Sequence, residues 1–280
     1  MNSAEQFIGI TAPEVKLAAA LFSNKKLPPE YAGLPYAEDL FLADGLWAAD
    51  KLIEKKITVD MFFVCPEKLS EKDAKAADRM KKYAKNTYYI SEKVCARISD
   101  RDGAEGAFIV ARLPRLRLSD IKLGDNMTAI ILDGQEQPGN IGAIIRSLDA
   151  AGGDFAVYTH KRVKMTHSRL IRSSLGAAFM MPFVCADFDE LIKWLTENKF
   201  KAIVTDLTAT KNYFDVDYTG RVAIVCGNEY LGISPEWRNL EISEPVIIPM
   251  LGSVESLNVG FASTLVAYEC SLRQKGVIKR

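Results

Sequence analysis

The stretch Met127-Thr-Ala-Ile-Ile-Leu-Asp-Gly-Gln-Glu-Gln-Pro-Gly-Asn-Ile-Gly-Ala-Ile-Ile-Arg146 decides the fold. Residues 127–132 are almost entirely apolar, which predicts a strand buried on both faces of a sheet. After a polar turn, apolar residues recur at spacings of three and four up to a Gly-Gly pair at 152–153: Ile141, Ile144, Ile145 and Leu148. This spacing predicts a helix. A buried strand that leads directly into a helix is typical of a parallel α/β sheet.

The same alternation of apolar strands and helical patterns continues downstream. Short apolar runs predict strands at residues 155–158, 183–185, 201–205, 222–226 and 246–248. A helix is predicted by apolar residues at helical spacing: Phe188, Leu191, Ile192 and Leu195. For residues 127–280 the sequence therefore predicts a mostly parallel sheet with helices on both faces.

The first part of the chain predicts a second, smaller α/β domain. We expect helices at residues 38–55 and 70–85 and strands at 61–65 and 107–111. A Pro and three Arg at residues 112–118 then break the apolar pattern, so we place a linker there. The expected organisation is an N-terminal domain over residues 1–113, a linker over 114–126 and a C-terminal domain over 127–280. The Lys-rich stretch at 68–85 interleaves acidic residues, which favours a solvated helix face over a nucleic-acid patch.

Composition restricts the class of protein. Of 280 residues, 48% are hydrophobic and 26% charged, which excludes collagenous and wholly disordered chains. Lys plus Arg equals Asp plus Glu at 36 each, so no global field attracts nucleic acid, although local patches could. The sequence has no apolar run long enough to span a bilayer and no signal peptide, so we expect a soluble, cytoplasmic protein. With two His and five scattered Cys, we expect reduced thiols and no metal site.

Polar residues that could act on a ligand follow three of the predicted strands, at the edge where parallel sheets bind ligands. Asn140 is suited to cap the helix that begins there. Arg146 lies one turn after Gly142, which leaves room for a phosphate or ribose to reach the guanidinium. The alternative is that Asn140 is only a cap and that Arg146 is a surface ion-pair partner.

The other two segments also have structural alternatives. Gly227 and Gly232 bracket a loop whose backbone amides could contact a ligand, with Glu229 as an acceptor, but such a sequence is also typical of a turn. Ser256 and Asn258 precede an apolar helix and are common helix-start residues, so a capped helix would explain them. The chain has no G-x-x-x-x-G-K-[ST] and no G-x-G-x-x-G after a first strand, which disfavours a phosphate loop or an ordinary dinucleotide fold.

Taken in order, these segments resemble the SpoU (TrmH-like) branch of the SPOUT RNA methyltransferases. The family's first motif is matched by Asn140, Gly142, Arg146 and Gly152, and the second by Gly227, Asn228 and Glu229 with Gly232 following. The third motif is matched by Ile248, Pro249, Met250, Ser256, Leu257, Asn258 and Val259. Residues 174–177 with Pro182, and more weakly residues 41–45 as a helix entry, also resemble the family. Gly260 and Tyr230 depart from its usual residues.

The resemblance implies a C-terminal domain with a deep trefoil knot that binds S-adenosylmethionine. By carry-over, Gly227, Ile248 and Leu257 would hold this cofactor through backbone groups, Asn228 would belong to the same loop, and Met250 and Gly252 would pack nearby. The implied reaction is transfer of the sulfonium methyl to a ribose 2′-hydroxyl of RNA, so alignment matters more than covalent chemistry.

Arg146 is the residue to which the resemblance assigns the central catalytic role. A guanidinium is a poor base at neutral pH, so we expect it to hold a nucleotide phosphate and stabilise the developing oxyanion; a proton-accepting role is the alternative. Asn140, Glu229, Ser256 and Asn258 would position Arg146 and the ribose.

The resemblance also implies partners. The family forms homodimers through the knotted domain, and the last helix, residues 258–274, offers Phe261, Leu265, Val266 and Leu272, for which core packing is the alternative role. The N-terminal domain would read RNA, and a basic stretch at residues 161–172 would border the RNA unless it is a solvated loop. Large-subunit ribosomal RNA is the expected substrate; a transfer-RNA 2′-O-methyltransferase and a catalytically inactive RNA-binding protein are the alternatives.

Overall fold

The computed structural model describes residues 6–99 and 105–278 of the chain. These residues divide into two compact units. The first comprises Met1–Arg115 together with Met165–Met180, and the second comprises Leu116–Lys164 together with Met181–Arg280. A short segment from the second half of the sequence thus packs with the first unit, which the sequence pattern did not predict.

The first unit is a mixed five-stranded sheet with helices, in the order β1-β4-β3-β5-β2. β5 runs antiparallel to β3 and β2, and the remaining pairs are parallel. The strands are β1 (Gln6–Phe7), β2 (Leu40–Asp44), β3 (Val59–Val64), β4 (Asn86–Tyr89) and β5 (Ala107–Arg112). The helices are α1 (Pro13–Ser23), α2 (Pro29–Ala32), α3 (Ala49–Glu54), α4 (Glu71–Tyr83), α5 (Glu92–Ile98), α7 (Ser168–Ser173) and α8 (Ala177–Met180). The predicted strands at 61–65 and 107–111 and the charged helix at 70–85 are confirmed, with boundaries shifted by up to two residues.

The predicted helix at residues 38–55 is wrong over residues 40–44, which form a strand, and helical turns begin only after Gly45, at Leu46–Ala48 and Ala49–Glu54. Residues 40–43 are all buried and form most of β2, which pairs with β5 through Phe41 opposite Ala111. Four consecutive buried residues cannot lie on one face of a helix, whereas a strand that is covered on both faces of its sheet can bury all of them, even at the edge of the sheet where β2 lies. Gly45 then adopts φ +105°, which ends the strand, and the helix is reduced to α3.

The second unit is a six-stranded parallel sheet in the order β11-β9-β10-β6-β7-β8. Its strands are β6 (Met127–Asp133), β7 (Phe155–Thr159), β8 (Phe183–Cys185), β9 (Phe200–Thr205), β10 (Arg221–Cys226) and β11 (Ser243–Val246). Its helices are α6 (Pro138–Ala151), α9 (Phe188–Glu197) and α10 (Val259–Gln274). All seven residues of β6 are buried, as expected for a strand near the centre of a covered parallel sheet. The predicted parallel α/β fold is confirmed.

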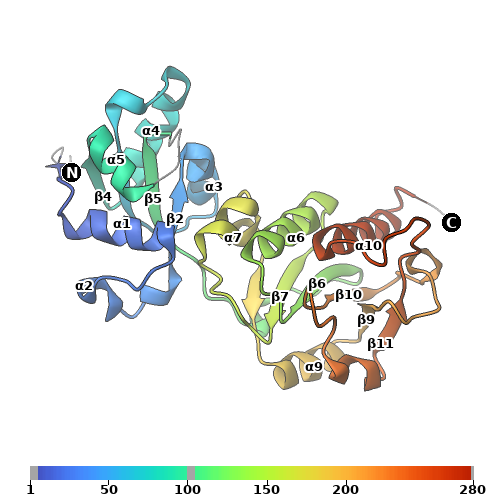
Figure 1. The fold of residues 1–280 in the computed structure, drawn as a ribbon. Coiled ribbons are helices and arrows are strands. Elements are labelled where there is room, and N and C mark those ends of the chain that lie inside the picture. Colours follow the sequence, from blue (N-terminus) through green and yellow to red (C-terminus); the bar gives the residue numbers. More distant parts are fainter. Residues whose placement is uncertain (1–5, 100–104, 279–280) are drawn as a thin grey trace. The chain divides into compact units, whose positions relative to one another are not determined.

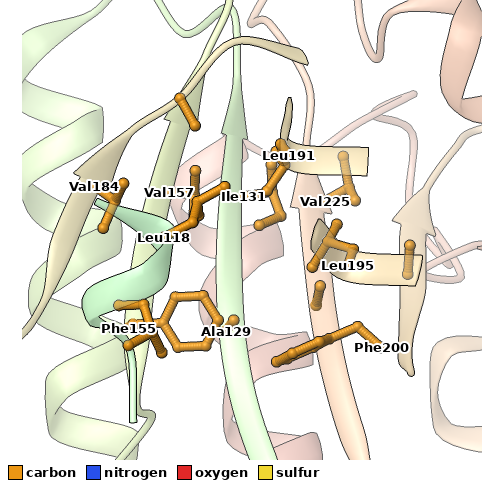
Figure 2. Packing of buried hydrophobic residues seen from close by; sticks show 14 of the residues in the cluster. Leu118, Ala129, Ile131, Phe155, Val157, Val184, Leu191, Leu195, Phe200 and Val225 are labelled. Atoms are coloured by element: carbon orange, nitrogen blue, oxygen red, sulfur yellow. The ribbon is translucent and has the colours of Figure 1, made fainter. Parts of the chain in front are cut away.

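Helices cover both faces of this sheet (Figure 1). α6 and α10 pack together against β6 and β10 on one face. On the other face, Leu191 and Leu195 of α9 meet Ile131, Val157 and Val225 from the strands (Figure 2). α6 ends as the sequence predicts, because Gly152 adopts the left-handed conformation with φ +75° that closes a helix.

One strand boundary differs from the prediction in a way that shapes the site. The strand expected at 246–248 is instead Ser243–Val246, at the edge of the sheet beside β9. Pro245, which cannot donate to a ladder, is tolerated on an edge strand. Ile247 makes an isolated bridge to Asn212, so that Ile248 has already left the sheet and lies in the following loop.

Candidate active site

A cavity of about 500 Å³ lies where the carboxyl ends of β9 and β10 meet the start of α10. This is the edge at which parallel α/β sheets bind ligands. Predicted site residues that line it are Gly227, Asn228, Glu229, Ile248, Met250, Ser256, Leu257 and Asn258. Further wall residues are Thr205, Asp206, Leu207, Tyr230, Gly232, Ile233, Val246, Val259 and Ala262. The fold thus brings most of the predicted site together from segments far apart in the sequence.

Glu229 connects the cavity to the helix that carries Arg146. Its carboxylate accepts the backbone N–H groups of Glu136 and Gln137, each at 3.2 Å, and the Asn140 side-chain amide at 3.0 Å. These two N–H groups lie directly before α6, and the N-terminal end of a helix carries partial positive charge, so a carboxylate is favourable there. Glu229 therefore fixes the loop after β10 against the start of α6.

The prediction that Asn140 caps α6 is wrong. The helix begins at Pro138, with Gln137 in the N-cap position, and Asn140 lies within the first turn. Proline suits the first helical position because its φ is already helical and its missing N–H would have no partner there. Asn140 uses its side chain to donate to Glu229 instead.

The loop after β10 is held in a closed turn by Asn228. The backbone of Asn228 exchanges two hydrogen bonds with Gly232, at 2.7 and 3.0 Å. Its side-chain oxygen accepts from the N–H groups of Tyr230 and Leu231, and its amide donates to the Gly134 carbonyl at 2.7 Å. These bonds occupy the Asn228 side chain, so its contribution to the cavity is to shape the loop.

Gly227 occupies the narrowest point of this turn. A Cβ at this position would overlap the backbone of Gly232 and Ile233. Behind it, the Gln135 side-chain amide, fully buried, donates to the Gly227 carbonyl. Burial raises the pKa of the neighbouring Cys226 thiol to about 12, so this cysteine is not a thiolate nucleophile at neutral pH.

A buried carboxylate anchors the far side of the same loop. Asp133, at the end of β6, accepts the Ser234 backbone N–H at 2.7 Å, the Ser234 hydroxyl at 2.8 Å and His160 Nδ1 at 2.7 Å. The His160 ring stacks on Phe188, with centroids 5.1 Å apart. The loop after β10 is thus fixed at both ends. Its own Glu229 bonds to the start of α6, and its Ser234 bonds to Asp133 at the end of β6.

Asn258 is the N-cap of α10, as the sequence predicts. Its side-chain oxygen accepts the Gly260 N–H at 2.9 Å, and the residue also lines the cavity. A helix cap and a place in the cavity wall are compatible, so the capped helix does not exclude a ligand role for Asn258.

Arg146 and Gly252 lie outside this cavity wall. Arg146 is exposed on α6, and its guanidinium makes no hydrogen bond or ion pair within residues 6–99 and 105–278. The surface ion pair that was its alternative role is therefore not present among those residues. Gly252 lines an adjoining open hollow of about 800 Å³, together with Met250, Val254 and Leu265.

The sequence analysis missed the cavity residues at the end of β9, which are Thr205, Asp206 and Leu207. β9 is the neighbour of β10, and these residues lie at the ligand-binding edge of the sheet. Burial would raise the pKa of Asp206, but hydrogen bonds from Thr208 and the nearby Arg238, 3.1 Å away, hold it below its usual range. Asp206 is therefore a carboxylate at neutral pH. Its position after a predicted strand was the available signal, but the segment has no Gly to draw attention to it.

The described part of the chain contains no group of three or more His, Cys, Asp or Glu side chains that could hold a metal ion. No helix within it is long and apolar enough to cross a bilayer. Of the five cysteines, four are buried and Cys185 is exposed, and all are free thiols.

The sequence model of the SpoU rRNA Methylase family matches residues 127–268. The 23S rRNA (uridine(2479)-2′-O)-methyltransferase of Streptomyces viridochromogenes is 32% identical over 172 residues, which are 59% of this chain and 59% of that protein. The chain thus spans less than two thirds of this relative. The 23S rRNA (guanosine-2′-O-)-methyltransferase RlmB of Escherichia coli strain K12 is 30% identical over 198 residues, 68% of this chain and 78% of that protein.

A solved structure extends the likeness to both units. The crystal structure of an AdoMet-bound rRNA methyltransferase from Sinorhizobium meliloti matches 99% of this chain and 100% of its own, with a TM-score of 0.83 and 22% sequence identity. At this identity the likeness shows a shared fold.

Proposed function

The chain belongs to the SpoU rRNA Methylase family, and on that premise we propose that it transfers the methyl group of S-adenosylmethionine to a ribose 2′-hydroxyl of large-subunit ribosomal RNA. The observation that carries the proposal is the cavity at the ends of β9 and β10. Glu229 lines this cavity and also bonds to the start of α6, the helix that carries Arg146. Two curated relatives named as 23S rRNA 2′-O-methyltransferases support this substrate.

The cavity suits S-adenosylmethionine in size and chemistry. Its volume falls within the range of about 300–1,000 Å³ that is usual for ligand pockets. Apolar walls from Ile248, Leu257 and Val259 can enclose the adenine, while the carboxylates of Asp206 and Glu229 can accept from hydroxyl or ammonium groups. The bound cofactor would supply an electrophilic methyl on a sulfonium. We assign Gly227, Ile248, Met250 and Leu257 to its binding, with Asn228 shaping the loop that holds it and Gly252 at the adjoining edge.

Arg146 is assigned to the nucleotide. A guanidinium stays protonated at neutral pH and offers a planar fork of donors that fits a phosphate. It would hold the phosphate beside the target ribose and stabilise the oxyanion that develops as the 2′-hydroxyl attacks. Asn140 and Glu229 would position α6, and hence Arg146, while Ser256 and Asn258 would orient the ribose. Because the transfer is an in-line displacement, alignment by these residues supplies most of the catalysis.

The proposal is tested by transfer of labelled methyl from S-adenosylmethionine to total bacterial RNA, with ribosomal and transfer-RNA fractions counted separately. We expect label in the large-subunit fraction and a fall of roughly 100-fold or more in Arg146→Ala, the scale of losing one oxyanion donor. Cofactor affinity should be unchanged in this variant. Label in transfer RNA would favour the alternative substrate, and cofactor binding without methylation would favour an inactive RNA-binding protein.

We also propose a homodimer through α10. The helix buries Val266, Ala267 and Cys270 in its own unit but exposes Phe261, Leu265 and Tyr268 at helical spacing. Of the four residues predicted for this contact, Val266 is therefore core, Leu272 is half-buried, and Phe261 and Leu265 are available. Exposed apolar patches of this kind mark interaction surfaces.

The remaining assignments follow from the family. The region over residues 1–113 would be the RNA-reading domain, joined by 114–126 to a knotted methyltransferase domain over 127–280, and the reaction would take place in the cytoplasm. The trefoil knot and the dimer remain predictions.

A further inference from the structure

The first unit contains its own cavity, of about 380 Å³, separate from the methyl-transfer site. Its lining comes from the end of α1, from β2 and the short helix Leu46–Ala48, and from α7, all of which belong to that unit. The side chains on which the argument depends are Trp47, Asp44, Arg169 and Arg172. One face of a ligand would thus meet an indole, and its edges would meet two guanidinium groups and one carboxylate.

Specific hydrogen bonds hold α7 at this cavity. The Asn24 side chain accepts the Ser168 N–H at 2.9 Å and donates to the Ser168 hydroxyl at 2.8 Å. That hydroxyl donates in turn to the Phe22 carbonyl at 2.8 Å. Asn24 adopts φ +54° after the last turn of α1, a conformation that Asn tolerates better than most residues. This clamp places the two arginines of α7, 125 or more residues later in sequence, beside β2.

The aromatic side is fixed as well. The Trp47 indole N–H donates to the Asp44 carbonyl at 2.9 Å, and the ring packs on Phe179 with centroids 6.5 Å apart. A pinned indole loses little further freedom when a flat ring stacks on it. Arg169 is exposed, and its guanidinium makes no hydrogen bond or ion pair in the described residues, so its five donors are open to a ligand.

We propose that this cavity binds one nucleotide of single-stranded RNA, with the base against Trp47 and a neighbouring phosphate on Arg169. The inference rests on the proposed function, because it adds a recognition point for the same RNA substrate. Nucleobases stack on aromatic rings, arginine forks match phosphate oxygens, and a carboxylate such as Asp44 accepts from base N–H groups. A base can enter a recess of this kind only when it is unpaired, which favours single strands over duplex.

The test measures binding of the full-length protein to fluorescein-labelled single-stranded oligoribonucleotides by anisotropy, across a salt titration. Trp47→Leu should weaken binding roughly 5- to 100-fold, the scale of one lost base stack, while Trp47→Phe should retain most of the affinity. Arg169→Gln should reduce the slope of log affinity against log salt by about 0.7, the value for one phosphate contact on a single strand. Lys72→Gln is the matched control, since Lys72 is exposed on α4 of the same unit and lies outside the cavity wall.

Separate readouts distinguish this inference from the proposed function. S-adenosylmethionine affinity and circular dichroism should be the same in all four variants, which excludes misfolding. Unchanged RNA affinity and salt slope in both Trp47→Leu and Arg169→Gln would overturn the cavity assignment, whatever the methylation result. Equal competition by free nucleoside monophosphates and by oligoribonucleotides would also overturn it, because a free nucleotide would then be the ligand. If the wild-type protein binds RNA through Trp47 but transfers no methyl group, the proposed function is refuted and the cavity assignment stands.

Discussion

At the scale of single residues, Gly227 is the position where the site tolerates least change. The Asn228–Gly232 turn folds back so closely that an added Cβ would overlap the backbone of Gly232 and Ile233. Because backbone atoms cannot move aside as a flexible side chain can, the whole turn would have to shift. Glu229 and Ser234, which hold the turn at either end, would oppose that shift.

We therefore expect Gly227→Ala to lower S-adenosylmethionine affinity roughly 5- to 150-fold while the protein still folds, since overpacking of this kind costs about 1–3 kcal/mol. Isothermal titration calorimetry measures the change. Gly139→Ala is the matched control, because a Cβ there meets nothing within 4 Å. Wild-type affinity in Gly227→Ala would show that the turn does not shape the cofactor site.

The residues of the site were predictable where a local rule applied. Residues that follow parallel strands lie at the ligand edge, which made Gly227, Glu229 and Asn258 candidates, and the family resemblance then assigned their roles. The partner of Glu229 was not predictable, because a carboxylate that caps a helix 90 residues earlier in the chain leaves no local pattern. Asp206 was missed for a similar reason, since only the strand order places its loop beside that of β10.

At the scale of elements, the strands of the first unit are joined by a charged cluster around Asp60. This residue lies at the register shift between Val59 and Met61, where β3 bulges against β5. Its carboxylate accepts two hydrogen bonds from Arg112 of β5, at 2.6 and 2.7 Å, and one from Lys85, at 2.9 Å. Burial would raise the pKa of Asp60, but these cations hold it below its usual value.

The direction of the Asp60 pKa shift determines how the free energy of unfolding depends on pH. A carboxylate whose folded pKa lies below its unfolded value of about 3.9 stabilises the fold above that pH, and the contribution is lost as the pH falls through the folded pKa. We expect Asp60→Asn to lower the free energy of unfolding by about 1.5–3 kcal/mol at pH 7, and by progressively less as the pH falls below about 4. Urea unfolding followed by circular dichroism at neutral and acidic pH tests this.

Asp50→Asn provides the comparison for Asp60. Asp50 pairs with Arg79, and both side chains are largely exposed, at 69% for Asp50 and 49% for Arg79. We therefore expect Asp50→Asn to lower the free energy of unfolding by under about 1 kcal/mol. Equal effects of the two substitutions, or an effect of Asp60→Asn that persists unchanged at low pH, would contradict the role given to the cluster.

Elements were predicted well where burial follows a simple period. β6 and α6 have unbroken apolar and helical patterns, and both lie where the sequence places them. β2 was mistaken for a helix because its identity depends on pairing with β5, about 70 residues away, and not on its own pattern. α7 shows the same limit, since nothing local indicates that a helix between β7 and β8 packs with the first unit.

At the scale of the whole molecule, the exposed face of α10 would connect the proposed dimer to the proposed cofactor site. Leu265 on this face also lines the open hollow formed by Met250, Gly252 and Val254, which adjoins the cavity that we assign to the cofactor. Leu251 in the same loop is 98% exposed and Phe261 is 70% exposed. A monomer would leave these apolar residues in water, whereas a second copy seated on α10 would bury them and complete the wall beside Met250.

This arrangement predicts that assembly and cofactor affinity fall together. Phe261→Arg places a charge at the centre of the exposed face, and burying an unpaired charge is far more costly than exposing it. We expect sedimentation velocity to show a dimer for the wild type and a monomer for this variant, with S-adenosylmethionine affinity lowered at least tenfold. Leu123→Arg, at an exposed apolar residue of the same unit that is not part of α10, should remain dimeric. If Phe261→Arg is monomeric but keeps full cofactor affinity, each copy closes its own cavity. If Phe261→Arg is still a dimer, the interface lies elsewhere.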